Sequence, residues 1–240
     1  MLNSLKDQDV MSEHEMYEYK WQGGEAVSLP LGKVVCVGRN YAEHAKELNN
    51  PIPTEPLLFM KPATSLVDFA KPVKIPTGFG EVHYESEISI LIGSRLSINE
   101  DGSLPSQEQA KQAICGVGAA LDLTLRDLQS KLKEKGQPWE KAKAFDGSCP
   151  VSAFVPVEQA GDVFDMSIAL EIDGVQVQSG SSKDMLTPIY SLLSYIVQFF
   201  TLLPGDVVLT GTPKGVGCIE ANQSLKLSLN DKIEVESSTC

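Results

Sequence analysis

The stretch His83-Tyr-Glu-Ser-Glu-Ile-Ser-Ile90 contains two glutamates one residue apart and continues as an alternating run with apolar residues. This alternation predicts a β-strand, on which side chains two residues apart point to the same face. Glu85 and Glu87 are therefore aimed at one point. Carboxylates held this way beside apolar sequence repel each other unless a cation lies between them, which indicates a hard divalent metal. A solvent-facing acidic edge is the alternative interpretation.

A third carboxylate, Asp122, ends the apolar run of small residues Gly116-Val-Gly-Ala-Ala-Leu121. A carboxylate at the end of a buried run needs a partner, so Asp122 is a candidate third ligand. Three carboxylates suit Mg²⁺ or Mn²⁺, which prefer oxygen ligands in octahedral geometry. The positions left open would accept a bidentate oxo-acid. Alternatively, Asp122 caps a helix that begins near Thr124.

His44 and Glu47 lie at i and i+3 of a helix predicted over 38–48, so they share one face. Asn40 is its expected cap. A carboxylate beside a histidine orients the ring and stabilises its cation, which suits a general base. An ordinary exposed pair on a helix surface is the alternative.

Candidate substrate-binding cations follow later in the chain. Arg126 is expected to share a helix side with Asp122, and Gln129 follows one turn later. Lys143 precedes the segment Gly147-Ser-Cys-Pro150. A cation beside an oxo-acid can bind its carboxylate or stabilise an enolate. In each case a solvated surface side chain is the alternative.

The remaining pattern predicts a β-rich α+β fold. Strands are expected over 33–37, 87–92 and 224–236, with a hairpin of 167–172 and 175–179 around Asp173-Gly174. Helices are expected over 124–135 and, fully buried, over 186–203. Strands outnumber helices without alternating with them, which disfavours a doubly wound sheet. Residues 1–25 are predicted to be a loosely held polar leader, and 26–240 one catalytic domain.

Composition excludes several classes of function. The 240 residues carry a formal net charge of −12, which disfavours nucleic acid and anionic membranes as partners. The five cysteines are scattered and fit neither a zinc site nor a disulfide framework. No signal-peptide pattern is present, and the longest apolar stretch is too short to span a bilayer. We therefore predict a cytoplasmic protein.

Seven segments, taken together and in their order along the chain, resemble the fumarylacetoacetate hydrolase family, and the resemblance covers about residues 30 to 238. They are Val37-Gly-Arg-Asn-Tyr-Ala-Glu-His44, Leu58-Phe-Met-Lys-Pro62, His83-Tyr-Glu-Ser-Glu87, Leu121-Asp-Leu-Thr-Leu-Arg-Asp127, Trp139-Glu-Lys-Ala-Lys-Ala-Phe-Asp146, Cys149-Pro-Val-Ser-Ala-Phe-Val-Pro156 and Leu209-Thr-Gly-Thr-Pro-Lys-Gly-Val-Gly217. The resemblance is greatest to short, single-domain acylpyruvases and oxaloacetate decarboxylases. It implies a mixed β-sandwich roll, usually a homodimer.

The resemblance also implies roles for individual residues. The family's metal-binding carboxylates match Glu85, Glu87 and Asp122, and a His–Glu dyad matches His44 and Glu47. Lys143 is expected to add positive charge beside the reacting oxo-acid. The substrate-binding positions match Arg39, Arg126, Gln129, Gly211 and Thr212. The sequence around Asn49-Asn50-Pro51 varies within the family, so the substrate is open.

The expected activity is metal-dependent hydrolysis of a C–C bond in an acylpyruvate, such as fumarylpyruvate or acetylpyruvate. For this reaction His44 would activate water. The same site would also suit oxaloacetate decarboxylation or keto–enol tautomerisation. Isomerisation or decarboxylation of hydroxy-dienedioates is the alternative among enzymes. A non-catalytic, metal-dependent oxo-acid-binding protein is the alternative from another class.

Overall fold

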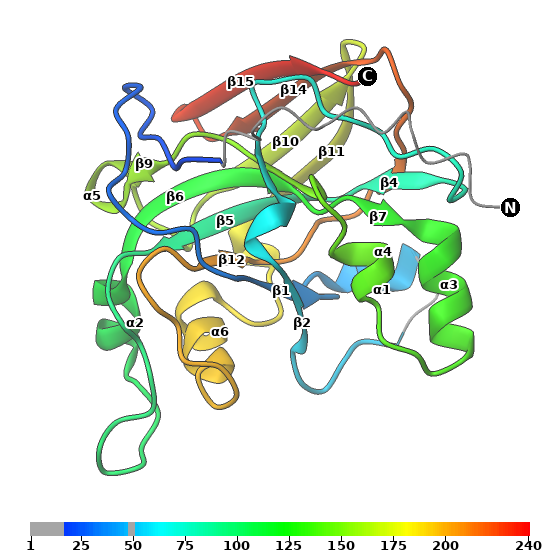
Figure 1. The fold of residues 1–240 in the computed structure, drawn as a ribbon. Coiled ribbons are helices and arrows are strands. Elements are labelled where there is room, and N and C mark those ends of the chain that lie inside the picture. Colours follow the sequence, from blue (N-terminus) through cyan, green and yellow to red (C-terminus); the bar gives the residue numbers. More distant parts are fainter. Residues whose placement is uncertain (1–16, 48–50) are drawn as a thin grey trace, which may run out of the picture.

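The computed structural model describes residues 17–47 and 51–240, and its centre is a curled sheet of eight strands (Figure 1). The order is β2-β1-β12-β5-β6-β8-β3, and β9 pairs with β6. The strands are β1 (Val34–Gly38), β2 (Leu57–Lys61), β3 (Leu66–Asp68), β5 (Ser86–Ile92), β6 (Ile114–Leu121), β8 (Cys149–Val151), β9 (Val155–Pro156) and β12 (Val207–Leu209).

The pairing of β5 with β6 determines where the functional site lies. The two strands are antiparallel, with Ser86 opposite Leu121, so the start of β5 adjoins the end of β6. Every residue of β5 is buried, and the small residues of β6 allow other backbone and side chains to approach closely. A Cβ on Gly118, for example, would lie 2.8 Å from Ser89 Oγ. The apolar run before Asp122 is therefore a strand.

Two smaller sheets complete the β-structure. The four-stranded sheet packs on β5 and β6 and lies above them in Figure 1. Its order is β11-β10-β14-β15, with β10 (Ser167–Ile172), β11 (Val175–Ser181), β14 (Ser224–Leu229) and β15 (Ile233–Ser238). The expected hairpin turns at Asp173-Gly174, where both residues have positive φ. The three-stranded sheet contains β4 (Val82–Tyr84), β7 (Thr124–Leu125) and β13 (Gly217–Cys218).

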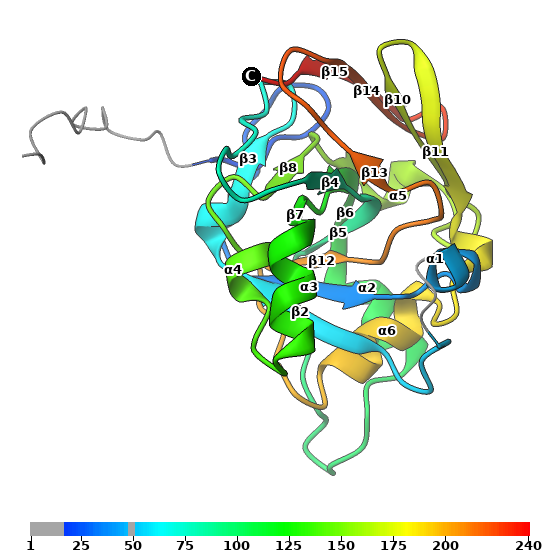
Figure 2. The same ribbon diagram turned by 90° about the vertical axis from the view of Figure 1, so that its right-hand side faces the viewer.

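Helices cover the edges of these sheets. In Figure 1, α2 and α6 lie below the central sheet, and Figure 2 shows α3 beside α4. The helices are α1 (Ala42–Glu47), α2 (Gln107–Ala113), α3 (Arg126–Glu134), α4 (Glu140–Lys143), α5 (Val157–Ala160) and α6 (Ile189–Ile196), with 3₁₀ turns η1 (Ala63–Ser65) and η2 (Ser182–Asp184). The predicted β-rich α+β fold is confirmed.

Two predicted helices differ from the structure. The buried helix expected over 186–203 is limited to α6, because Pro188 precedes it and Leu202 already pairs with Leu96 as an extended bridge. The helix expected from Gly38 begins only at Ala42. Asn40 does not cap it, because its side chain bonds instead to the backbone of Thr187 and Thr210.

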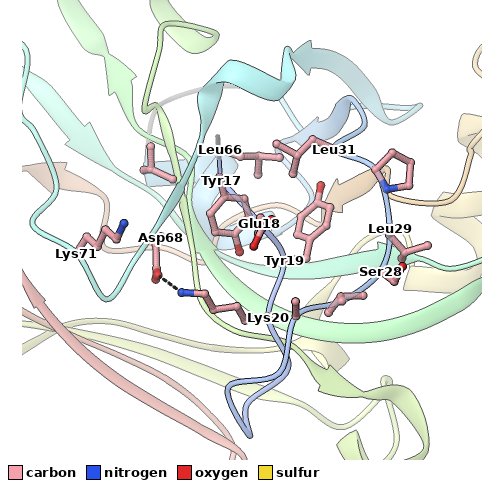
Figure 3. Close-up of a pocket in the computed structure, with 14 residues that line it drawn as sticks. Tyr17, Glu18, Tyr19, Lys20, Ser28, Leu29, Leu31, Leu66, Asp68 and Lys71 are labelled. Carbon is pink, nitrogen blue, oxygen red and sulfur yellow. Dashed lines mark hydrogen bonds and ion pairs between the residues drawn. The ribbon is translucent and has the colours of Figure 1, made fainter. Parts of the chain in front are cut away.

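The described part of the predicted leader, residues 17–25, is anchored to the domain at Tyr19 and Trp21. Residues 1–16 lie outside the described residues. Tyr19, however, is buried and donates a hydrogen bond to the Gly205 carbonyl at 2.8 Å, and Trp21 forms a bridge with Phe154. Tyr17, Tyr19, Leu31 and Leu66 are among the residues that line a surface groove of about 1030 Å³ (Figure 3). The domain boundary at residue 25 stays a prediction.

Within the part of the chain that the structure describes, no helix is long and apolar enough to cross a membrane.

Candidate active site

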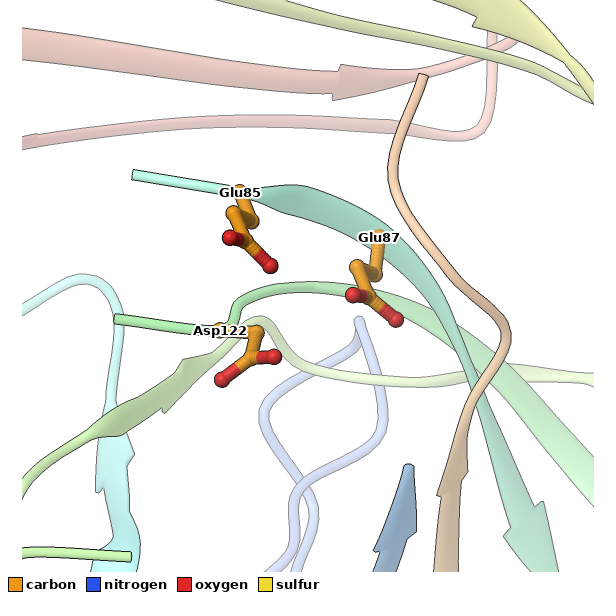
Figure 4. Close-up of side chains that lie close together, drawn as sticks. All are labelled: Glu85, Glu87 and Asp122. Atoms are coloured by element: carbon orange, nitrogen blue, oxygen red, sulfur yellow. The ribbon is translucent and has the colours of Figure 1, made fainter. Parts of the chain in front are cut away.

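Three carboxylates converge where β5 begins and β6 ends (Figure 4). Glu85 precedes β5, Glu87 lies within it, and Asp122 follows β6 directly. The Asp122 amide donates to the Glu85 carbonyl at 2.8 Å, which fixes the two backbones side by side. One oxygen from each carboxylate lies within 4.8 Å of the others, and all three side chains are buried. The predicted cluster is thus present, and the solvent-facing alternative for the pair is wrong.

Three cations surround two of these carboxylates. Lys143, at the end of α4, donates to Glu85 Oε2 at 2.8 Å and to Asp122 Oδ2 at 2.6 Å. Arg126 donates to Glu85 Oε1 at 2.5 Å. Lys61 Nζ lies 2.8 Å from Asp122 Oδ1, although without the geometry of a hydrogen bond. Among the described residues Glu87 has no ion-pair partner, and it accepts a hydrogen bond only from the Gly211 amide.

The carboxylates differ in how easily they ionise. Burial would raise the pKa of Glu85, but Lys143 and Arg126 outweigh it and hold that pKa well below its usual range. For Glu87, burial raises the pKa, and the neighbouring charges of Asp122 and Glu85 raise it further. Ionised Glu87 therefore lacks sufficient positive charge nearby. A hard divalent cation bound by these oxygens would supply that charge, so the residues fit a metal site.

His44, on α1, lines the same cavity. It is 4% exposed, and its Nδ1 lies 3.4 Å from Glu47 Oε2. Glu47 also accepts hydrogen bonds from the Gly215 amide through both of its oxygens. The carboxylate is therefore held by the backbone while it faces the ring. This arrangement suits a base whose second ring nitrogen is free to face a substrate.

Most of the predicted site residues share this cavity. It is lined by Val37, Gly38, Arg39, His44, Leu57, Phe59, Glu85, Glu87, Asp122, Arg126, Gln129, Lys133, Trp139, Lys143 and Thr212. Gly211 and Glu47 do not line the cavity themselves. The Gly211 amide donates a hydrogen bond to the lining residue Glu87, and the Glu47 carboxylate contacts the lining residue His44. One geometric expectation is wrong: Arg126 begins α3, whereas Asp122 lies before β7 and neither shares nor caps that helix.

Two buried side chains were not found from the sequence. Lys61 is fully buried at the end of β2, and besides Asp122 it contacts Ser148 and the Lys143 carbonyl. A lysine ending an apolar run, as in Leu57–Lys61, is a weak signal for such a role. Gln178 of β11 accepts from the Ser86 amide and donates to Thr212 Oγ1. It lies in an alternating hairpin, and nothing in that pattern marks it.

The model of the fumarylacetoacetate hydrolase C-terminal domain matches residues 33–239. The chain belongs to the fumarylacetoacetate hydrolase family. Oxaloacetate tautomerase YcgM from Escherichia coli strain K12 is 48% identical over 217 residues, which cover 90% of this chain and 96% of that protein.

Solved structures of the family agree with this fold. A family protein from Yersinia pestis CO92 superimposes with a TM-score of 0.89 at 48% identity, covering 93% of this chain and all of that one. Fumarylpyruvate hydrolase from Pseudomonas aeruginosa, solved in complex with Mn²⁺ and pyruvate, gives a TM-score of 0.85 at 32% identity. That match covers 96% of this chain and 98% of the hydrolase. The chain is thus a single-domain member of an enzyme family.

Proposed function

We propose that this chain is a divalent-metal-dependent oxaloacetate tautomerase, which interconverts the keto and enol forms of this dicarboxylic 2-oxo acid. The observation that carries the proposal is a single cavity that is lined both by three clustered carboxylates and by His44, which contacts Glu47. The name of the Escherichia coli relative supports the same reaction. Mg²⁺ and Mn²⁺ are the metals that these oxygen ligands favour.

Each residue would have a distinct task in this reaction. His44 takes a proton from C3, the electron pair of that C–H bond becomes the double bond between C2 and C3, and the protonated ring gives the proton to the 2-oxo oxygen. Glu47 orients the ring and stabilises its cationic form. Lys143 stabilises the negative charge that develops on the 2-oxo oxygen. When bound, the metal supplies Lewis-acid polarisation of the 2-oxo acid.

Binding of the substrate would rest on neighbouring groups. Arg126 and Gln129 are joined by a hydrogen bond of 2.8 Å and present donors beside the carboxylate cluster. Thr212 is buried at the cavity wall, where Gln178 fixes its hydroxyl. These groups suit the C1 carboxylate of a 2-oxo acid. A cytoplasmic homodimer belongs to the same proposal.

Hydrolysis of acylpyruvates is the second candidate function, favoured by the likeness to the Pseudomonas aeruginosa fumarylpyruvate hydrolase. In that reaction His44 would take a proton from water instead of carbon. The sequence alone favoured hydrolysis first. We place tautomerisation first because the relative so named is 48% identical, whereas the fumarylpyruvate hydrolase is 32% identical. Decarboxylation of oxaloacetate would use the same cavity. A merely oxo-acid-binding protein would not need His44, Glu47 and Lys143 together.

The test is enol–keto conversion of oxaloacetate, followed by the ultraviolet absorbance of the enol, with Mg²⁺ and then with a chelator. We expect His44→Ala to lower kcat/KM at least about a hundredfold, the usual contribution of a general base. Lys46→Ala is the control, because Lys46 lies on the same helix but is exposed and pairs with the exposed Glu43. Wild-type rates in His44→Ala would remove His44 from the mechanism.

A further inference from the structure

Two cations of the cavity, Arg39 and Lys133, have no carboxylate partner among the described residues. This separates them from Lys61, Lys143 and Arg126, each of which is paired with Glu85 or Asp122. Both unpaired cations line the same cavity as the carboxylate cluster. Glu85 and Asp122 in the buried part of the cavity therefore have cation partners, whereas its more exposed, outer part carries unpaired positive charge.

The geometry of α3 directs Lys133 toward the cavity. Arg126, Gln129 and Lys133 are spaced i, i+3 and i+7, so they lie on one face of the helix. Arg126 reaches the inner carboxylate Glu85, and Lys133 begins about two turns farther along the axis, roughly 10 Å by helical rise. Long side chains on a helix point back toward its N-terminus, which brings the Lys133 ammonium toward Arg126.

Like charges crowd this outer part. Partial burial lowers the pKa of Lys133, and the positive charges of Arg39 and then Arg126 lower it further. Arg39 follows β1 directly, and its backbone there has a φ of 61°. Cations that repel one another at a cavity wall attract an anion into it. Glu85 and Asp122 already pair with Lys61, Lys143 and Arg126, and Glu87 forms no ion pair with Arg39 or Lys133 among the described residues, so the anion must come from outside the protein.

From this arrangement we infer that Lys133 and Arg39 bind the distal carboxylate of the substrate and make the enzyme selective for dicarboxylic over monocarboxylic 2-oxo acids. The inference deepens the proposed function and rests on it. The 2-oxo acid end of the substrate faces the carboxylate cluster, and its second carboxylate lies at the outer cations. Lys133 is thereby a specificity-determining residue that the sequence had not indicated.

The experiment compares oxaloacetate with its C4 monomethyl ester, which keeps the 2-oxo acid but lacks the distal charge. For Lys133→Met we expect kcat/KM to fall at least about tenfold with oxaloacetate, the scale of a lost charge-assisted hydrogen bond, and less than about twofold with the ester. Most of the loss should appear in KM. Lys131→Met is the matched control, because Lys131 is exposed on α3 and does not line the cavity. Arg39→Met should show the same difference between the two substrates.

An equal fall with both substrates, or no fall with oxaloacetate, would overturn the inference. Calorimetric titration of the Mn²⁺-loaded protein with each compound separates this result from the proposed function. If the wild type turns over neither compound, the proposed function fails. If the wild type binds oxaloacetate more tightly than the ester and Lys133→Met does not, the distal subsite is still supported. If Lys133→Met keeps this difference in affinity, the distal subsite is refuted.

Discussion

At the scale of single residues, the site is a balance of buried charges. Lys61 is fully buried, yet its ammonium is not isolated, because Asp122 and two oxygens of Ser148 surround it. Removing one partner of a buried ion pair leaves the other charge uncompensated, which costs far more than the pair contributes. Lys61 therefore matters mainly because Asp122 is buried beside it.

This balance predicts a large loss of stability in Lys61→Met. The buried Asp122 would lose a counter-ion, and Ser148 would lose a donor, so we expect the free energy of unfolding to fall by about 3–5 kcal/mol. The midpoint of urea denaturation measures it. Lys20→Met is the matched control. Lys20 and Asp68 form an ion pair at 3.3 Å with side chains 47% and 19% exposed, and such pairs contribute at most about 1 kcal/mol. A similar small change in both variants would refute this view of Lys61.

At this scale, the residue types alone made part of the site predictable from the sequence. Glu85, Glu87 and Asp122 were predictable because carboxylates beside apolar runs need a partner. Lys61 was missed because a lysine at a strand end is usually an exposed side chain with a buried stem. Arg126 was placed near the cluster for a mistaken reason, since it reaches Glu85 from the start of α3 and shares no helix with Asp122.

At the scale of elements, the loop after β12 contacts both Glu87 of β5 and Glu47 of α1. The Gly211 amide donates to Glu87 Oε2 at 2.6 Å, and the Glu47 carboxylate receives the Gly215 amide. Gly211 has a φ of 96°, and a Cβ there would lie 2.7 Å from Asn40 Cβ. Only glycine allows this loop to approach both sides of the cavity.

We therefore expect Gly211→Ala to reduce both stability and tautomerase activity. The backbone conformation alone costs about 1–3 kcal/mol for a residue with a side chain, and the contact with Asn40 adds to it. Gly102→Ala isolates the first effect, because Gly102 has a φ of 82° with open space around its position. Thermal unfolding and kcat/KM of both variants are the measurements. If Gly211→Ala behaves like Gly102→Ala, the close approach has no importance.

Elements that depend on residues close together in the sequence were predicted correctly from local patterns. The strand after Glu85 and the hairpin at Asp173-Gly174 follow from alternation and turn chemistry. The helix over 186–203 was predicted too long, because apolar sequence after Ile196 resembles helix but packs as turn and bridge. Asparagine is a favoured N-cap residue, but the Asn40 side chain instead forms hydrogen bonds with the backbone of Thr187 and Thr210.

At the scale of the whole molecule, distant strands build the site. β1 and β12 pair in parallel although about 170 residues separate them, as in Cys36 with Leu209. Gln178 of the four-stranded sheet bonds both the start of β5 and Thr212, so two sheets fix one cavity wall. Such pairings leave no periodicity in the sequence. The fold class was predictable from composition and alternation, whereas the strand order and the charge network required the structure.

The central claim is that the three carboxylates form a divalent metal site, and calorimetric titration with Mn²⁺ tests it most directly. Glu87→Gln is the decisive variant, because Glu87 has no cation partner within residues 17–47 and 51–240, and its raised pKa means that ionising this carboxylate costs free energy. The metal-free variant should be at least as stable as wild type, so weaker binding would not result from unfolding. Glu81→Gln is the control, since that side chain is 62% exposed and outside the cluster.

The account predicts saturable Mn²⁺ binding by the wild type and by Glu81→Gln, with an affinity at least about tenfold lower in Glu87→Gln. Wild-type affinity in Glu87→Gln, or no binding by the wild type, would contradict the metal site.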